Sequence, residues 1–410
     1  MRRLTVLLAV LLACQSLIPA GAADARHDRH DRHDRHDREV RFATFNASLN
    51  RGAAGELRAD LEAALEGDVD PQLGAVLEII DRNDPDVLLV NEFDTGTDGD
   101  RRTVRMFAEL AGYRYFFTAP SNTGIPSGFD LNNNGVIGGP EDAFGFGFFP
   151  GQFGMAVFSK YLIDTRRART FQHFRWADMP GAMLPTNPDG SSFYSDEELE
   201  VFRLSSKSHW DLPIVISHRK VVHFLVSHPT PPVFDGPEDR NGTRNFDEIG
   251  FWADYVRPGR ASRYIYDDDG REGGLHPGAR FVIAGDQNSD PLDGDSVPGA
   301  IQQLLEHPRI NTRVTPDSRG AVEASRLQGG ANLTHRSNPR FDTADFADGA
   351  PGNLRADYVL PSKQLKIRDA GVFWPVQGAP GSELTGVFPF PSSDHRLVWV
   401  DVAARRGRRC

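Results

Sequence analysis

Cysteine is nearly absent from this chain of 410 residues. The two cysteines are Cys14, close to the N-terminus, and Cys410, the last residue. A disulfide framework needs pairs of cysteines inside the folded region, so none is available here. Packing must therefore stabilise the core, with help from bound ions if any are present.

Long hydrophobic runs and an excess of positive charge are also missing. No later apolar stretch approaches the roughly 20 residues that span a bilayer, so we expect no stable membrane span. The formal net charge is −11, which argues against a protein that holds nucleic acid by bulk electrostatics alone. It does not exclude a hydrolase of phosphoesters, because bound divalent cations can reverse the local sign of charge.

Residues 1–22 have the pattern of a signal peptide. Two arginines precede an apolar run from Leu4 to Ala13, and Ala20-Gly21-Ala22 suits a cleavage site. We therefore expect a secreted protein, extracellular or periplasmic. An alternative is that Leu11-Leu12-Ala13-Cys14 acts as a lipoprotein box, which would anchor the protein through a lipid on Cys14.

A polar linker, one folded domain and a short tail account for the remaining chain. Residues 23–39 contain four His-Asp-Arg repeats. They indicate a solvated linker, or alternatively a metal-scavenging tract. We expect the folded domain over 40–403, a basic tail at 404–410 and a monomeric protein.

Short apolar strands and long polar stretches alternate through the domain. Strand patterns lie at 40–45, 87–90, 155–158, 221–227, 281–284, 358–360 and 397–402. A helix is expected after Asp70, which can cap it, with Pro71 in its first turn. The polar stretches at 119–152, 177–212, 230–280 and 311–352 have the composition of loop insertions on one enlarged α/β domain.

Polar side chains stand next to these strands repeatedly. They are Asn46, Glu92, His228, Asp286, Asn288, Asp357, Asp394 and His395. In α/β sheets, residues at strand ends commonly converge on one crevice. Oxygen ligands with few imidazoles and no cysteine suit Mg²⁺ or Mn²⁺ better than a structural zinc. Each residue alone could be a turn former or a scaffold residue, but the whole ordered set predicts a site.

In this order, the residues resemble the motifs of the endonuclease/exonuclease/phosphatase superfamily. That superfamily includes pancreatic-type deoxyribonucleases, abasic-site endonucleases, neutral sphingomyelinases and inositol polyphosphate phosphatases. The matching segments are Asn46, Asn91-Glu92-Phe93, 154–160, Ser227-His228, 285–288, Ala356-Asp357-Tyr358 and Ser393-Asp394-His395. The resemblance runs from about Val40 to Val402. It implies a four-layer α/β sandwich, with two packed mixed sheets flanked by helices.

The resemblance also implies a role for each site residue. Glu92 is expected to be the main metal ligand, with Asn46 and Asp394 beside it. His395 is expected to activate or orient the attacking water, with Asp357 holding its ring and Asp286 as an alternative base.

The remaining two residues, Asn288 and His228, are expected to contact the phosphoryl group. Many members have Gln where this chain has Asn91. We expect that difference to alter the surroundings of the metal ligand and to leave the ligand intact.

A second metal motif lies in the stretch 119–152. Asp130, Asn132 and Asn134 fall at positions one, three and five of a calcium-loop pattern, with Gly135 at six and Glu141 at twelve. A structural Ca²⁺ site is expected there. The alternative is a tight turn rich in Asn and Gly.

The expected activity is single-step hydrolysis of a phosphoester by a metal-assisted water. A secreted nuclease or broad phosphodiesterase is the first interpretation, and a phosphomonoesterase or phospholipid-head phosphodiesterase is the second. A non-enzyme alternative is a calcium-dependent binding module that kept the fold. The Phe- and Gly-rich segment 145–154 is expected to serve packing and turns, and Arg240 and Arg244 fit a phosphate clamp or a charged surface loop equally well.

Overall fold

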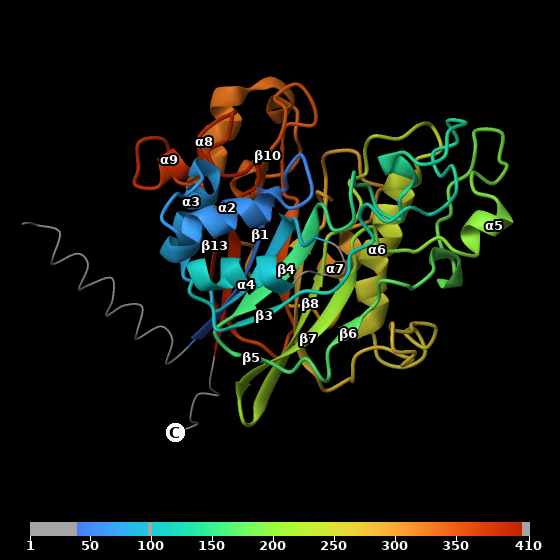
Figure 1. Ribbon diagram of the computed structural model, residues 1–410, viewed down its shortest axis with the longest axis horizontal. Coiled ribbons are helices and arrows are strands. Elements are labelled where there is room, and N and C mark those ends of the chain that lie inside the picture. Colours follow the sequence, from blue (N-terminus) through green and yellow to red (C-terminus); the bar gives the residue numbers. More distant parts are fainter. Residues whose placement is uncertain (1–38, 97–100, 404–410) are drawn as a thin grey trace, which may run out of the picture.

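The computed structural model describes residues 39–96 and 101–403, which form two stacked sheets between outer helices (Figure 1). The signal peptide, Cys14, the His-Asp-Arg repeats and the basic tail lie outside the described residues, so these expectations stay predictions. Among the described residues, no helix combines the length and apolar character needed to cross a membrane.

The first sheet has six strands and carries both ends of the described chain. Its spatial order is β13 (Ile367–Val372), β14 (Val398–Ala403), β1 (Glu39–Leu49), β2 (Val87–Phe93), β4 (Gly154–Ser159) and β3 (Tyr115–Phe117). The central pair β1 and β2 is parallel, and the other pairs are antiparallel. The sheet is therefore mixed, as the resemblance implies.

The second sheet is also mixed. Its order is β12 (Asp357–Pro361), β9 (Arg280–Asp286), β8 (Lys220–Ser227), β7 (His209–Ser217) and β5 (Leu162–Ile163), with β6 (Arg169–Thr170) also paired to β7. Only β8 and β9 are parallel among these pairs. A separate two-stranded ribbon joins β10 (Ala344–Asp345) to β11 (Asn353–Leu354).

Alternation along the strands explains how the layers pack. Successive side chains of a strand point to opposite faces of the sheet. In β1, Val40 and Phe42 face the second sheet, whereas Ala43 and Phe45 face the outer helices. The rings of Phe42 and Phe224 lie 5.5 Å apart between the two sheets.

Helices α2 (Glu56–Leu65), α3 (Pro71–Asn83) and α4 (Arg101–Leu110) cover the outer face of the first sheet (Figure 1). The predicted helix after Asp70 is confirmed as α3. The side chain of Asp70 accepts a hydrogen bond from Leu73 N at 2.9 Å, and Pro71 is the first helical residue. This cap satisfies one of the free N–H groups of the first turn.

Helix α6 (Arg240–Val256) covers the second sheet and corrects one prediction. The stretch 230–280 is not a loop insertion, because this helix packs Trp252 and Val256 into the core. Its periodicity is hidden because Asn245, Asp247 and Glu248 are also buried, each through hydrogen bonds to other segments. These polar residues interrupt the row of apolar residues at helical spacing from which an amphipathic helix is recognised in a sequence.

Four further helices are short or peripheral: α5 (Asp196–Leu199), α7 (Gln302–Leu305), α8 (Arg319–Gln328) and α9 (Ser382–Thr385). Helix α8 lies inside the stretch 311–352, which therefore is not wholly loop either. Single 3-10 turns occur at Pro140–Asp142, Trp176–Asp178, Gly330–Leu333 and Pro339–Phe341. With its two sheets and outer helices, the predicted four-layer α/β sandwich is confirmed.

Candidate active site

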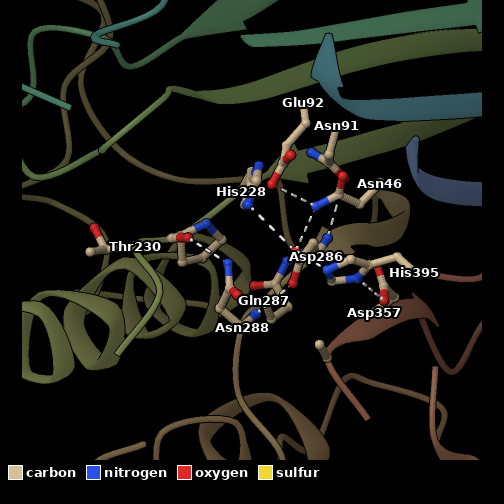
Figure 2. Close-up of polar contacts among 12 residues, drawn as sticks. Asn46, Asn91, Glu92, His228, Thr230, Asp286, Gln287, Asn288, Asp357 and His395 are labelled. Atoms are coloured by element: carbon tan, nitrogen blue, oxygen red, sulfur yellow. Dashed lines mark hydrogen bonds and ion pairs between the residues drawn. The ribbon is translucent and has the colours of Figure 1, made fainter. Parts of the chain in front are cut away.

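The predicted site residues come from both sheets and meet where strand ends adjoin (Figure 2). Asn46 lies on β1, Glu92 on β2, and Asp394 and His395 shortly before β14. From the second sheet, Asp286 ends β9, Asp357 begins β12 and His228 directly follows β8. Side chains that are far apart in the sequence therefore surround one buried carboxylate, that of Asp286.

Asp286 is the hub of these contacts, and it is 1 % exposed. Its Oδ2 accepts a hydrogen bond from Asn46 Nδ2 at 3.1 Å and lies 3.5 Å from His228 Nε2 and 3.6 Å from His395 Nε2. Figure 2 shows these three side chains turned towards Asp286. Burial raises the pKa of Asp286 to about 7, and the charge of Asp357 adds to that increase.

A pair of strand irregularities aims Glu92 into the site. The register between β1 and β2 pairs Asn46 with Asn91 and then shifts. Within the shifted segments, Glu92 has φ +54° and Ser48 has φ +48°. Such left-handed residues are uncommon outside glycine and re-aim a side chain at a bulge. Glu92 Oε1 consequently accepts a hydrogen bond from Asn46 Nδ2 at 3.1 Å.

His395 is held by a carboxylate of the second sheet, that of Asp357 on β12. Its Nδ1 lies 2.8 Å from Asp357 Oδ2, an oxygen that also accepts a hydrogen bond from Thr343 Oγ1 at 2.9 Å. The register of β12 on β9 places Asp357 opposite Asp286. Burial lowers the pKa of His395, but the charges of Asp357 and Asp286 outweigh it and hold that pKa well above its usual value.

Asp394 and Asn288 complete the predicted set. Ser48 Oγ donates a hydrogen bond to Asp394 Oδ1 at 3.4 Å. Burial raises the pKa of Glu92, and the nearby charge of Asp394 raises it further. Asn288 has φ +50° and donates from Nδ2 to Pro229 O at 3.1 Å, which places it beside His228. All eight predicted residues therefore belong to one site.

The chemistry of the donors fits a hard divalent cation. Glu92, Asn46 and Asp394 present oxygen atoms, and four carboxylates gather in the site when Asp286 and Asp357 are included. Such a concentration of buried negative charge is costly unless positive charge offsets it. In the described part of the chain, one group of three His or Asp residues has ligand atoms within 4.8 Å of one another: Asp286, Asp357 and His395.

Lys207 is a site residue that sequence patterns did not reveal. It is 7 % exposed, and its charge acts on Glu92, Asp286 and His228. Burial lowers its pKa, although the charges of Glu248 and Glu92 oppose that shift. Lys207 lies between two serines ahead of β7, where neither strand pattern nor spacing marks it.

Asn91, which stands where many family members have Gln, links the two sheets. Its Oδ1 accepts hydrogen bonds from Thr44 Oγ1 at 3.2 Å and from Asp286 N at 3.3 Å. This amide, shorter than the Gln that the resemblance leads us to expect, therefore fixes the end of β9 against β1 and β2. Glu92, the expected metal ligand, lies next to it in the site, and the expectation that this difference leaves the ligand intact stays a prediction.

The predicted calcium loop adopts a compact turn. Asp130 Oδ1 accepts a hydrogen bond from Asn134 N at 3.0 Å, and Asn132 Oδ1 accepts from the same N–H at 3.1 Å. Asn134 Oδ1 accepts from Val136 N at 2.8 Å. Glu141 follows in the 3-10 turn Pro140–Asp142. Side-chain oxygens that wrap their own loop occur both in calcium loops and in Asn-rich turns.

The sequence matches a known protein family. A sequence profile of the endonuclease/exonuclease/phosphatase family matches residues 43–395, most of the chain. No curated protein sequence matches it.

Three solved structures that are similar to this chain have low sequence identity to it. An endonuclease/exonuclease/phosphatase from Beutenbergia cavernae is 16 % identical with a TM-score of 0.47, covering 89 % of this chain and 72 % of its own. TDP2 from Caenorhabditis elegans is 16 % identical with a TM-score of 0.42, covering 94 % and 81 %. Beta toxin from Staphylococcus aureus is 13 % identical with a TM-score of 0.41, covering 88 % and 99 %. The profile match over most of the chain shows the lineage: the chain belongs to the endonuclease/exonuclease/phosphatase family.

Proposed function

We propose that the protein is a secreted, divalent-metal-dependent phosphoester hydrolase that acts on phosphodiesters, as a nuclease or a broad phosphodiesterase. The observation that carries this proposal is the convergence of a buried His395–Asp357 pair and the carboxylates of Glu92 and Asp286 on one site. A binding module would not need a positioned imidazole beside a potential metal ligand.

The cation is best assigned to Glu92, Asn46 and Asp394, with Mg²⁺ or Mn²⁺ as the ion. A metal held by Asp286, Asp357 and His395 would compete with the 2.8 Å hydrogen bond between His395 and Asp357. The oxygen set at Glu92 has the hard donors that Mg²⁺ prefers. Its hydrogen bonds, from Asn46 Nδ2 to Glu92 Oε1 and from Ser48 Oγ to Asp394 Oδ1, each use one oxygen of a carboxylate. When bound, the cation supplies charge neutralisation for the phosphoryl oxygens.

The protein's own residues position the reacting groups. Asp357 fixes the His395 ring through Nδ1, so Nε2 is the nitrogen that faces Asp286. The proton of the attacking water passes to this His395–Asp286 pair, whose facing atoms are 3.6 Å apart. Asn288 and His228 contact the phosphoryl oxygens and Lys207 adds positive charge beside them, so negative charge that develops on the phosphoryl group is stabilised.

A substrate screen tests the proposed activity. Purified mature protein with Mg²⁺ or Mn²⁺ is expected to hydrolyse plasmid DNA and bis(p-nitrophenyl) phosphate faster than p-nitrophenyl phosphate or sphingomyelin. The soluble diesters are expected to be hydrolysed faster than the monoester because the assigned groups contact one phosphoryl group and one water, and none is set aside to bind a second ionised oxygen. Preference for the monoester, or for the lipid diester sphingomyelin, would replace the nuclease or broad phosphodiesterase by one of the alternative activities, and no turnover of any substrate would end the proposal.

We also propose that the loop Asp130–Glu141 binds Ca²⁺ in a structural role. Asp130, Asn132, Asn134 and Glu141 stand at the ligand positions of the pattern. Ca²⁺ at millimolar concentration is expected to raise the melting temperature of the wild-type protein, because a ligand that binds only the folded state stabilises it. The shift should disappear in Asp130→Ala and persist in the control Asp269→Ala, an exposed aspartate of another loop. An equal shift in both variants would show that this loop is only a turn.

A further inference from the structure

A cavity of about 530 Å³ adjoins the site, and its wall includes Glu92, Lys207 and His228. Its size lies within the range of pockets that bind small molecules, roughly 300–1,000 Å³. The cavity therefore begins at the groups assigned to the phosphate and the cation. Whatever occupies it is attached to, or lies against, the phosphoryl group.

The wall away from those polar groups is largely aromatic. Five rings line it, from Phe146, Phe153, Tyr194, Phe202 and Phe234. Tyr194 and Phe202 are 5 % and 3 % exposed, and their ring centroids lie 4.9 Å apart. Arg244 of α6 lies over the Phe202 ring, 4.7 Å from its centroid. These side chains pack against one another, so this part of the wall forms without a ligand.

Two of the five rings are exposed at the cavity. The Phe146 side chain is 48 % exposed and Phe234 is 87 % exposed, and Phe234 also has φ +66°. Ligand pockets are typically concave and lined by apolar and aromatic side chains, which is the arrangement these two rings extend to the surface. Phe146 and Phe153 belong to the segment 145–154, for which packing and turns were expected, and both also line the cavity.

The charged side chains of the wall are Glu92, Glu141, Lys207, Arg240 and Arg244. The charge of Lys207 acts on Glu92, so an anion is favoured beside these two residues. An aromatic ring is favoured against the aromatic side chains of the wall by edge-to-face contacts. A ligand with a phosphoryl group at one end and a ring at the other matches both parts.

We infer that this cavity binds an aromatic substituent of the phosphoester, so that the protein selects substrates with a ring next to the scissile phosphate. The inference rests on the proposed function, because it takes the Glu92 end of the cavity as the phosphoryl site. Besides Glu92, the wall is formed by segments 131–153, 194–207 and 228–234 and by the start of α6, which are separate parts of the chain.

The test is calorimetric binding of two phosphonates, which contain a carbon–phosphorus bond in place of the ester and are not substrates. In the presence of Mn²⁺, phenylphosphonate is expected to bind the full mature protein about tenfold more tightly than methylphosphonate. Phe146→Ala is expected to reduce this ratio severalfold. The control Phe388→Ala removes a ring that is 83 % exposed and does not line the cavity, and it should leave the ratio unchanged.

Turnover of bis(p-nitrophenyl) phosphate by the same preparation separates this inference from the proposed function. Turnover together with equal affinity for the two phosphonates overturns the aromatic subsite and leaves the hydrolase intact. Turnover with a ratio that Phe146→Ala does not change overturns the assignment of the subsite to this cavity. Absence of turnover removes the proposed function and this inference with it.

Discussion

Replacing His395 by alanine is expected to lower kcat for diester hydrolysis by about 10²- to 10⁴-fold, the range typical of a lost general acid–base group. The ring is the imidazole that Asp357 holds and that faces Asp286 at 3.6 Å. Alanine leaves Asp286 alone to take the proton of the attacking water, without the imidazole that lies 3.6 Å from it and completes the accepting pair. Steady-state kinetics at saturating Mg²⁺ measures the effect.

The control for this variant is His218→Ala, which removes an exposed imidazole in the turn between β7 and β8. Its kcat is expected to match that of the wild type. Circular dichroism of both variants shows whether the fold is kept. A folded His395→Ala protein with undiminished kcat would remove this histidine from the mechanism.

The second large effect is expected from Glu92→Gln, which should weaken Mn²⁺ binding by about 100-fold or more. Even substitution of residues that only hydrogen-bond to a metal ligand typically lowers metal affinity by about 10- to 100-fold. Glutamine keeps the size of the side chain and removes the charge that attracts the cation. Because burial and Asp394 both raise the pKa of Glu92, loss of this charge also relieves repulsion. The thermal stability of the metal-free protein is therefore expected to be kept or raised.

Titration of the metal-free protein with Mn²⁺, followed by electron paramagnetic resonance, measures this affinity. The matched variant Glu109→Gln changes an exposed glutamate on α4 and should bind Mn²⁺ like the wild type. If Glu92→Gln bound Mn²⁺ with wild-type affinity, the cation would have to be assigned to other groups, and the trio Asp286, Asp357 and His395 would be the next candidate.

The site residues could be predicted because each stands beside a recognisable apolar strand. Asp286 follows a run of five buried residues, and His228 follows a similar run. Strand ends in such sheets meet at one crevice, so linear neighbours of strands become spatial neighbours of one another. Their type and order, compared with a known superfamily, then implied the roles.

Other parts of the site depend on contacts that no linear pattern encodes. Lys207 belongs to the site because the chain ahead of β7 passes beside Glu92, and this depends on tertiary packing. The orientation of Glu92 depends on a register shift that strand periodicity does not predict. The sequence pattern does not predict helix α6, because buried polar residues interrupt its apolar face. It therefore does not predict the cavity wall that α6 helps to form either.

We propose above that these dispersed residues hydrolyse a phosphodiester with the help of a bound divalent cation. The decisive measurement is the rate of bis(p-nitrophenyl) phosphate hydrolysis after treatment with EDTA, removal of the chelator and titration with Mg²⁺ or Mn²⁺. EDTA is expected to abolish hydrolysis, and one of these cations is expected to restore it in the wild type far more effectively than in Glu92→Gln. Hydrolysis that continues unchanged in EDTA would show that no bound cation takes part.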